Sequence, residues 1–323
     1  MESSYRYGDE ATASAYPLDV VVEPLWQSTN GKLRATFAIP PCPKAHIIVP
    51  SLAIDSMPYQ YQCTLGVGGN SWPLEPVPSR TREPTKRAPT QDKAKSPAQS
   101  STASSISTHI DCYHTEADIA ESELTIVLDR LEAPARYLLS VSIRPLEIEP
   151  ELCDATPIAL APPPPLSQKQ GPKELRDRIC SPTALAMTLQ HHQSSIEWLE
   201  VVEKCLDNAT KMYGSWPMAV YCAAAYHRLG AVEVVTSWTP ILRVLNAGVP
   251  VVASIRFAAG ELPGAPMDST GGHLVTVYGI EDDMVLVHDP AAPDVASVPR
   301  RYPLQAFANA WFRYRGAAYI LAA

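Results

Sequence analysis

The sequence lacks an excess of positive charge, a long apolar run and a tight cluster of cysteines. Its 26 Lys and Arg residues are outnumbered by 34 Asp and Glu residues, and the net charge of −8 excludes a broad basic surface for nucleic acid. No stretch approaches the ~18 consecutive apolar residues of a membrane span. The polar N-terminal segment also lacks the apolar core of a signal peptide. We therefore expect a cytoplasmic protein, unless a route that needs no signal exports it, with neither nucleic acid nor a membrane as partner.

The seven cysteines are spread through the chain, and no two of them form a Cys-x-x-Cys pair. Neither a disulfide framework nor a cysteine-ligated zinc site is therefore expected. An alternative is a metal site at His109, Cys112 and His114, but the spacing is loose and no fourth ligand is evident. We expect no metal and no cofactor.

Proline, by contrast, is abundant at 32 of 323 residues, which limits long helices. The chain is 46% hydrophobic and long enough for two domains. Up to about residue 150 the apolar runs are short, β-branched and separated by Pro, Gly, Asn and Ser, which is typical of an antiparallel β-sandwich. We assign residues 1–153 to this domain, with strands expected at 20–26, 33–39, 47–54, 124–128 and 137–143. Residues 76–107 contain almost no large apolar side chain, so a disordered insertion is expected there.

The second half has a different pattern. Residues 154–165 end in four consecutive prolines and are expected to form a stiff linker. In residues 166–323 the apolar periodicity predicts helices first and strands afterwards, which is typical of an α+β domain. The helices are expected at 182–192, 196–209, 216–229, 241–246 and 304–311, and the strands at 249–256, 273–278, 284–288 and 317–321.

Cys180 is the first candidate for chemistry. It precedes Pro182, and proline is favoured in the first turn of a helix. At a helix N-terminus the partial positive charge and the free backbone N–H groups favour a thiolate over a thiol. Cys180 is therefore a candidate nucleophile, whereas Cys205 and Cys222 lie in apolar helix faces and are expected in the core.

His273 and Asp289 are the second and third candidates. His273 follows two glycines in an otherwise apolar strand, and the next strand ends at His288 and Asp289. Reflecting the chain about a turn at 281–283 places Asp289 opposite about residue 274, where a carboxylate can hold the imidazole. His288 points to the other face of its strand. A thiol, an imidazole and a carboxylate are the groups that thiolate acyl chemistry requires.

An oxyanion donor is also needed, and Gln168 and Gln170 upstream of Cys180 are the two candidates. The segment 258–270, rich in Gly and Pro, is expected to line the site as a mobile loop. Trp216 and Gly272 are the expected substrate-binding residues, although a place in the core suits Trp216 equally well.

Several motifs together resemble the bacteriocin-leader-processing type of cysteine peptidase, and more narrowly its stand-alone bacterial relatives in the papain-like clan. They run in matching order from Leu166 to Leu321. The motifs are Ser167-Gln168, Cys180-Ser181-Pro182-Thr183, Gly214-Ser215-Trp216-Pro217, Gly272-His273-Leu274, Asp289-Pro290-Ala291-Ala292 and an aromatic helix at Trp311.

The resemblance implies a papain-like cysteine peptidase domain at residues 166–323, and more loosely a β-sandwich before it. It implies Cys180 as nucleophile, His273 as base, Asp289 as the residue that orients the base and a glutamine as oxyanion donor. The Ser-Gln pair favours Gln168 over Gln170. The implied reaction is hydrolysis of a peptide or isopeptide bond in a peptide or protein substrate.

Two further functions remain open. The same triad on the same fold also serves acyl transfer and deamidation, and a fold does not choose between them. The other alternative is a catalytically idle protein whose β-sandwich binds a glycan or a protein partner. The presence of Cys180, His273 and Asp289 together favours an enzyme.

Overall fold

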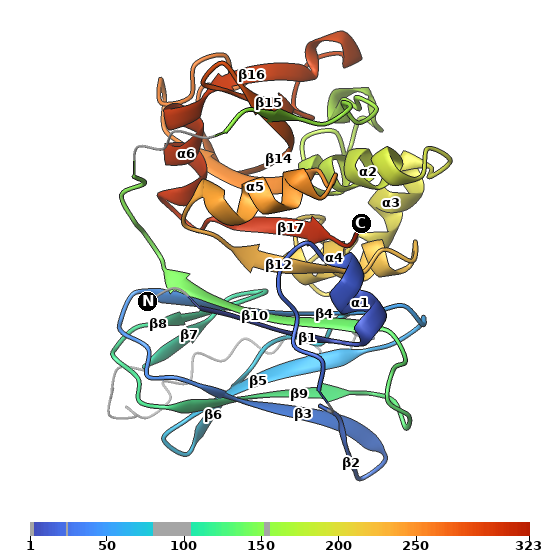
Figure 1. The fold of residues 1–323 in the computed structure, drawn as a ribbon, viewed down its shortest axis with the longest axis vertical. Helices are drawn as coiled ribbons and strands as arrows, with labels where there is room; N and C mark the ends of the chain where they lie inside the picture. The colour runs from blue at the N-terminus through green and yellow to red at the C-terminus, as the bar shows by residue number, and fades with distance from the viewer. Residues whose placement is uncertain (1–2, 24, 80–104, 152–155) are drawn as a thin grey trace, which may run out of the picture.

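The computed structural model describes residues 3–23, 25–79, 105–151 and 156–323. The chain is a mixture of helices and strands, with the strands arranged in three sheets. Two sheets belong to the first half of the chain, and the third belongs to the second half with most of the helices (Figure 1). Within the described residues, no helix combines the length and the apolar character needed to cross a bilayer.

The first half forms two antiparallel five-stranded sheets whose buried side chains share one hydrophobic cluster. In β3 and β9 buried and exposed residues alternate, so one face of that sheet packs inward and the other faces solvent. One sheet has the order β1 (Ser3–Gly8), β10 (Tyr137–Pro145), β4 (His46–Ile54), β8 (Tyr113–Thr115) and β7 (Ile106–Thr108). The other has the order β2 (Gln27–Thr29), β3 (Lys32–Ile39), β9 (Ser122–Leu128), β5 (Tyr61–Val67) and β6 (Asn70–Pro73).

The prediction of a strand at 20–26 is wrong. Val21 forms only an isolated bridge with Tyr7, and the side chains of Val21 and Val22 are 50% exposed. The edge of the sheet is taken by β1, a short strand in which Tyr5 and Tyr7 pack against the hydrophobic cluster while Ser4 and Arg6 make polar contacts. The short helix α1 (Glu10–Ala15) follows it, capped by Asp9.

Most of the insertion predicted at 76–107 lies outside the described residues. At its described ends the chain is ordered against the sheets. Val77 forms a bridge with Tyr61, Ser79 is buried, and β7 begins at Ile106.

The second half is built on a sheet with the order β12 (Gly230–Val234), β17 (Ala317–Leu321), β13 (Val251–Phe257), β14 (Thr270–Glu281), β15 (Met284–His288) and β16 (Pro299–Pro303). β11 (Ile158–Ala159), inside the predicted linker, pairs with β14. The residues before the prolines therefore run along this sheet. The helices are α2 (Cys180–His192), α3 (Trp198–Lys204), α4 (Trp216–Ala224), α5 (Trp238–Asn246) and α6 (Leu304–Phe312).

The helices expected at 196–209 and 216–229 are shorter than predicted. α3 ends at Lys204 and α4 ends at Ala224, and the apolar residues that follow α4 lead into β12. β12 pairs with β17 near the end of the chain, so β17 lies between β12 and β13. The order of the strands in the sheet therefore differs from their order along the chain, because this pairing is non-local.

The two halves pack directly on each other, with α4 and β12 against β4 and β10 (Figure 1). One hydrophobic cluster contains residues of both halves, among them Leu138 and Val232. A buried polar network crosses the same contact. Glu233 of β12 accepts hydrogen bonds from Arg6 Nε at 2.7 Å, Ser140 Oγ at 2.9 Å and Ser142 Oγ at 2.6 Å. Since α4 also contacts α2, the first half supports the helix that begins at Cys180.

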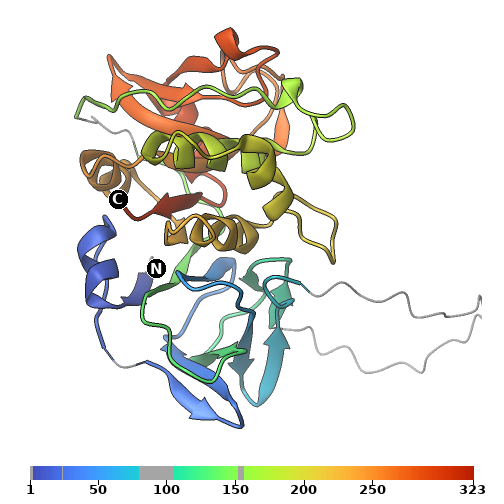
Figure 2. The ribbon, with the colours of Figure 1, turned by 90° about the vertical axis from the view of Figure 1, so that its right-hand side faces the viewer.

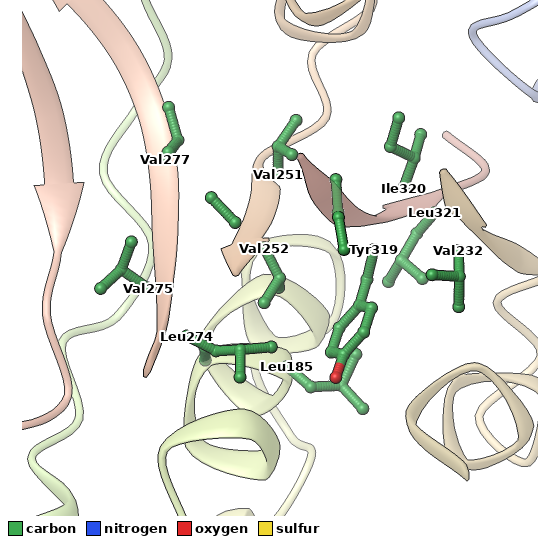
Figure 3. Close-up of a cluster of buried hydrophobic side chains, with 14 of the residues drawn as sticks. Leu185, Val232, Val251, Val252, Leu274, Val275, Val277, Tyr319, Ile320 and Leu321 are labelled. Atoms are coloured by element: carbon green, nitrogen blue, oxygen red, sulfur yellow. The ribbon is translucent and has the colours of Figure 1, made fainter. Parts of the chain in front are cut away.

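Figure 3 shows how α2 is held on the sheet of the second half. Leu185 of α2 lies beside Leu274 of β14, Val252 of β13 and Tyr319 of β17. All four side chains are buried. The packing fixes the helix start relative to the strand that carries His273.

Candidate active site

Cys180 is the first residue of α2 and is half-buried. The residue before the helix, Ile179, supplies no side-chain cap, so N–H groups of the first turn remain available. The turn is anchored from two sides. The hydroxyls of Ser181 and Tyr319 lie 2.9 Å apart, and Trp198 Nε1 donates to Thr183 Oγ1 at 3.0 Å.

His273 and Asp289 are brought together by the β14–β15 hairpin. The strands join through Asp282 and Asp283, whose φ angles of 51° and 56° are those of a tight two-residue hairpin turn. A bulge between Val277 and Gly279 shifts the ladder by one residue, and its last pair is Thr276 with His288. Continuing the ladder puts Asp289 opposite residue 275, one residue from the predicted position and diagonally across from His273.

The imidazole and the carboxylate form a short buried contact, with 2.7 Å between His273 Nε2 and Asp289 Oδ1. Their residues are 3% and 1% exposed. The carboxylate has two more donors, because Ala291 N donates to Oδ1 at 2.9 Å and the Tyr302 hydroxyl donates to Oδ2 at 2.8 Å. The orientation of Asp289 is therefore fixed at both oxygens.

The pKa shifts of the three groups favour an ion pair of thiolate and imidazolium. Burial acts to lower the pKa of His273, but the Asp289 charge, the hydrogen bond to it and the Cys180 thiol raise it to about 10. Burial acts to raise the pKa of Cys180, but a hydrogen bond with His273, its charge and the N–H groups of Leu274 and Ser181 bring that pKa below its usual value. The pKa of Asp289 is also lowered, against burial, by the charge of His273 and by the hydrogen bonds that it accepts.

The two candidate glutamines have different surroundings. Gln168 begins a short 3₁₀ turn, is 4% exposed, and donates from Nε2 to the carbonyl of Arg176 at 2.8 Å. Its backbone N–H donates to the carbonyl of Pro290, next to Asp289, at 2.8 Å. Gln170 is exposed. Of the two, Gln168 is the one bonded into the loops around the site.

The expected substrate-binding residues also differ from each other. Gly272 is exposed beside His273, and no atom lies within 4 Å of the position that a Cβ would take. Trp216 is 4% exposed in the core at the start of α4. Its backbone N–H donates to Asp111 Oδ2 at 3.2 Å, and the Arg315 guanidinium lies 5.8 Å from its ring centroid. These are the contacts of a core residue at the boundary between the two halves.

The alternative metal site gains no support from the geometry. Cys112 Sγ lies 3.7 Å from His114 Nε2, and the ring centroids of His109 and His114 lie 3.9 Å apart with the rings tilted by 39°. In the part of the chain that the structure describes, no group of three or more His, Cys, Asp and Glu side chains is arranged to hold a metal ion.

Tyr302 is a site residue that the sequence reasoning missed. It lies on β16, is fully buried, and bonds Asp289 from the strand next to β15. The only signal in the sequence is a tyrosine 13 residues after Asp289, in a segment rich in Pro and Arg. Such a segment does not predict a strand, so the contact becomes visible only once β16 is placed.

Comparison with known proteins gives a family for the second half. Residues 162–319 match the profile of the Peptidase_C39 like family. No curated protein matches the chain. One similar solved structure is described as a candidate C39-like peptidase from Bacillus anthracis, with 16% identity, a TM-score of 0.40, and coverage of 52% of this chain and 98% of that chain. On the match to the family profile, the part of the chain from residue 162 to residue 319 is similar to the C39-like peptidase family.

Proposed function

We propose that the protein is a cysteine peptidase that hydrolyses a peptide or isopeptide bond with Cys180 as nucleophile, His273 as general base and acid, and Asp289 as the residue that orients the imidazole. The observation that carries the proposal is the buried 2.7 Å contact between His273 and Asp289 beside a cysteine at a helix start. The similarity of residues 162–319 to the family agrees with it.

The fold assignments belong to the same proposal. Residues 166–323 form a papain-like peptidase domain, in which a helix carries the thiol and an antiparallel sheet carries the base. Residues 1–153 form a β-sandwich, supported by two sheets that share one hydrophobic cluster. Residues 154–165 connect the two.

The imidazole has two ring nitrogens, and Asp289 takes Nε2. Nδ1 is left to exchange a proton with the Cys180 thiol. The resulting thiolate attacks the carbonyl carbon of the scissile bond, and the carbonyl oxygen becomes negatively charged. The imidazolium then gives its proton to the leaving amine as the carbon–nitrogen bond breaks. Water attacks the thioester, His273 accepts its proton, and the carboxylic acid product leaves Cys180.

Gln168 is the proposed oxyanion donor. An amide NH₂ group has two hydrogens, and the bond to Arg176 uses one of them. The second hydrogen is available for the tetrahedral oxygen, together with N–H groups of the first turn of α2. We further propose that the exposed backbone at Gly272 bonds the substrate main chain, since no side chain obstructs it.

To test the proposal, a mixture of synthetic peptides is incubated with the protein, and the products are analysed by mass spectrometry. Hydrolysis gives paired fragments whose masses sum to the peptide plus one water, and Cys180→Ala gives none. A mass gain of about one unit on an intact peptide indicates deamidation, and a mass gain on an added amine indicates acyl transfer. Cleavage that persists in Cys180→Ala contradicts the proposed function.

A further inference from the structure

Arg178, two residues before Cys180, is exposed and has no carboxylate partner among the described residues. It is nevertheless held in place. Its Nη2 donates to the carbonyl of Lys211, and its guanidinium carbon lies 5.7 Å from the ring centroid of Tyr213. A guanidinium has five N–H donors in a fixed fork, so most of them remain available. The side chain is thus fixed by a neutral carbonyl and a ring while its charge stays uncompensated.

The two loops that Arg178 joins carry further Lys and Arg side chains. The loop before α2 and the loop before α4 lie on the same side of the molecule (Figure 2), and the bond from Arg178 to Lys211 joins them. The positively charged side chains of these two loops that form no ion pair with a described carboxylate are called the Arg178 surface. They are Lys173, Arg176, Arg178 and Lys211.

Most acidic side chains of these two loops are already engaged. Asp177 pairs with Lys169, and Asp207 is buried and accepts from Ser79 Oγ and Ala209 N. Glu174 is the remaining exposed carboxylate in the two loops. In a chain with a net charge of −8, the loops before α2 and α4 therefore carry excess positive charge.

The Arg178 surface adjoins the candidate active site through the backbone. The carbonyl of Arg176 accepts from Gln168 Nε2, and the loop ends at Cys180. An extended substrate advances about 3.3 Å per residue, so a group within a few residues of the scissile bond comes within reach of an arginine side chain.

We infer that Arg178 is the centre of a carboxylate-binding subsite, and that the preferred substrate carries a carboxylate within a few residues of the scissile bond. The carboxylate is either an acidic side chain or a free C-terminus, both of which a guanidinium fork binds. The inference rests on the proposed function, because it assigns the substrate class of the same site.

The experiment compares cleavage of matched peptides that differ in one charge. In one set of pairs, the two peptides have Glu or Gln at a position near the scissile bond. In the other set, the two peptides have neutral side chains and a free or an amidated C-terminus. We expect wild-type kcat/KM to favour the charged member about three- to tenfold, as for one charge-assisted hydrogen bond at an exposed site. Arg178→Gln brings the ratio close to one, and Arg178→Lys keeps part of it because the charge remains without the fork.

Arg243→Gln is the control, since Arg243 is an exposed arginine that pairs with Asp19 of the first half. It leaves the ratio unchanged. The preference also falls with added salt, as expected for an exposed contact. A preference in the Glu pairs identifies a side chain as the ligand, and a preference in the C-terminal pairs identifies a terminal carboxylate. Equal kcat/KM within every pair overturns the inference and leaves the proposed function intact.

A second measurement decides the question when no peptide in the set is cleaved. Cys180 is alkylated with iodoacetate or with neutral iodoacetamide, where the thiolate sulfur bonds to the CH₂ carbon and iodide leaves. Iodoacetate carries a carboxylate that Arg178 can bind, and iodoacetamide does not. We therefore expect Arg178→Gln to lower the ratio of the iodoacetate rate to the iodoacetamide rate at least threefold. An unchanged ratio overturns it. Circular dichroism melting of each variant checks that the fold is retained.

Discussion

The Tyr302 hydroxyl and Asp289 Oδ2 are 2.8 Å apart, and both groups are buried. The same carboxylate holds His273 through its other oxygen. Tyr302 is thus a positioning residue, which acts on the imidazole through the carboxylate. Tyr302→Phe removes the hydroxyl and leaves one buried carboxylate oxygen without this donor. We expect kcat to fall about tenfold with KM little changed, and the free energy of unfolding to fall by ~1–3 kcal/mol.

The matched control for this substitution is Tyr278→Phe. Tyr278 lies on β14 and packs against His288, with 4.8 Å between the ring centroids. Tyr278→Phe also removes a hydroxyl but leaves the hydrogen bonds of Asp289 in place, so kcat is expected to stay near the wild-type value. An equal loss of kcat in both variants, measured by steady-state kinetics, argues against the positioning role.

The pH dependence of the reaction follows from the two shifted pKa values. The pKa of Cys180 is lowered and that of His273 is raised to about 10, so the reactive ion pair exists between them. We expect kcat/KM to rise with pH on a limb below the usual thiol pKa of ~8.5, and to fall as His273 loses its proton near pH 10. The check is a pH–rate profile.

A different profile would point to a different mechanism. A neutral histidine that acts as a simple base gives a rate that rises through about pH 6.5 and then stays constant. That single rising limb is incompatible with a resting ion pair. In Asp289→Asn the alkaline limb moves to lower pH, because the charge that raises the His273 pKa is gone.

The two glutamines provide a third prediction. Gln168 is buried and bonded to Arg176, whereas Gln170 is exposed. Loss of an oxyanion donor lowers kcat ~10²–10³-fold and changes substrate affinity little. We therefore expect this fall in kcat for Gln168→Ala and not for Gln170→Ala. The same substrate is used for both variants. A large loss in Gln170→Ala alone reverses the assignment, and no loss in either means that backbone N–H groups suffice.

The contact between the two halves provides a fourth prediction. Glu233→Ala leaves Arg6 without its carboxylate partner in a buried site and removes the acceptor of Ser140 and Ser142. The free energy of unfolding is expected to fall by ~3–5 kcal/mol. The exposed pair of Arg34 and Glu123 supplies the control, since Glu123→Ala costs less than about 1 kcal/mol. Denaturant titration measures both, and equal small losses would mean that the network contributes little.

Local patterns in the sequence predicted several elements and the proximity of His273 to Asp289. β15 and β17 lie at their expected residues, and α2 begins two residues before its predicted start. The partnership of His273 and Asp289 was accessible because a hairpin is a local structure whose register follows from its turn. The sequence placed Asp289 one residue from its position because the turn is formed by Asp282 and Asp283 alone, whereas the predicted turn included residue 281. The bulge between Val277 and Gly279 offsets part of that difference.

Features that depend on distant parts of the chain were not predictable in the same way. β1 has only two aromatic side chains, Tyr5 and Tyr7, in its 6 residues, and Ser4 and Arg6 hold it through polar contacts to β10 and Glu233. β12 was not predicted, because its partner, β17, comes more than 80 residues later. Tyr302 was missed for the same reason, since its role depends on the pairing of β16 with β15.

The pairing of a Cys180 thiolate with the His273 imidazolium is examined most directly by the rate of alkylation of each cysteine in the native protein. Iodoacetamide is applied at pH 6, and peptide mass spectrometry follows modification with time. We expect Cys180 to react at least tenfold faster than the other described cysteines, which are all buried, and His273→Ala to abolish this advantage. Modification of Cys180 at the same rate in the wild type and in His273→Ala would mean that His273 does not activate the thiol.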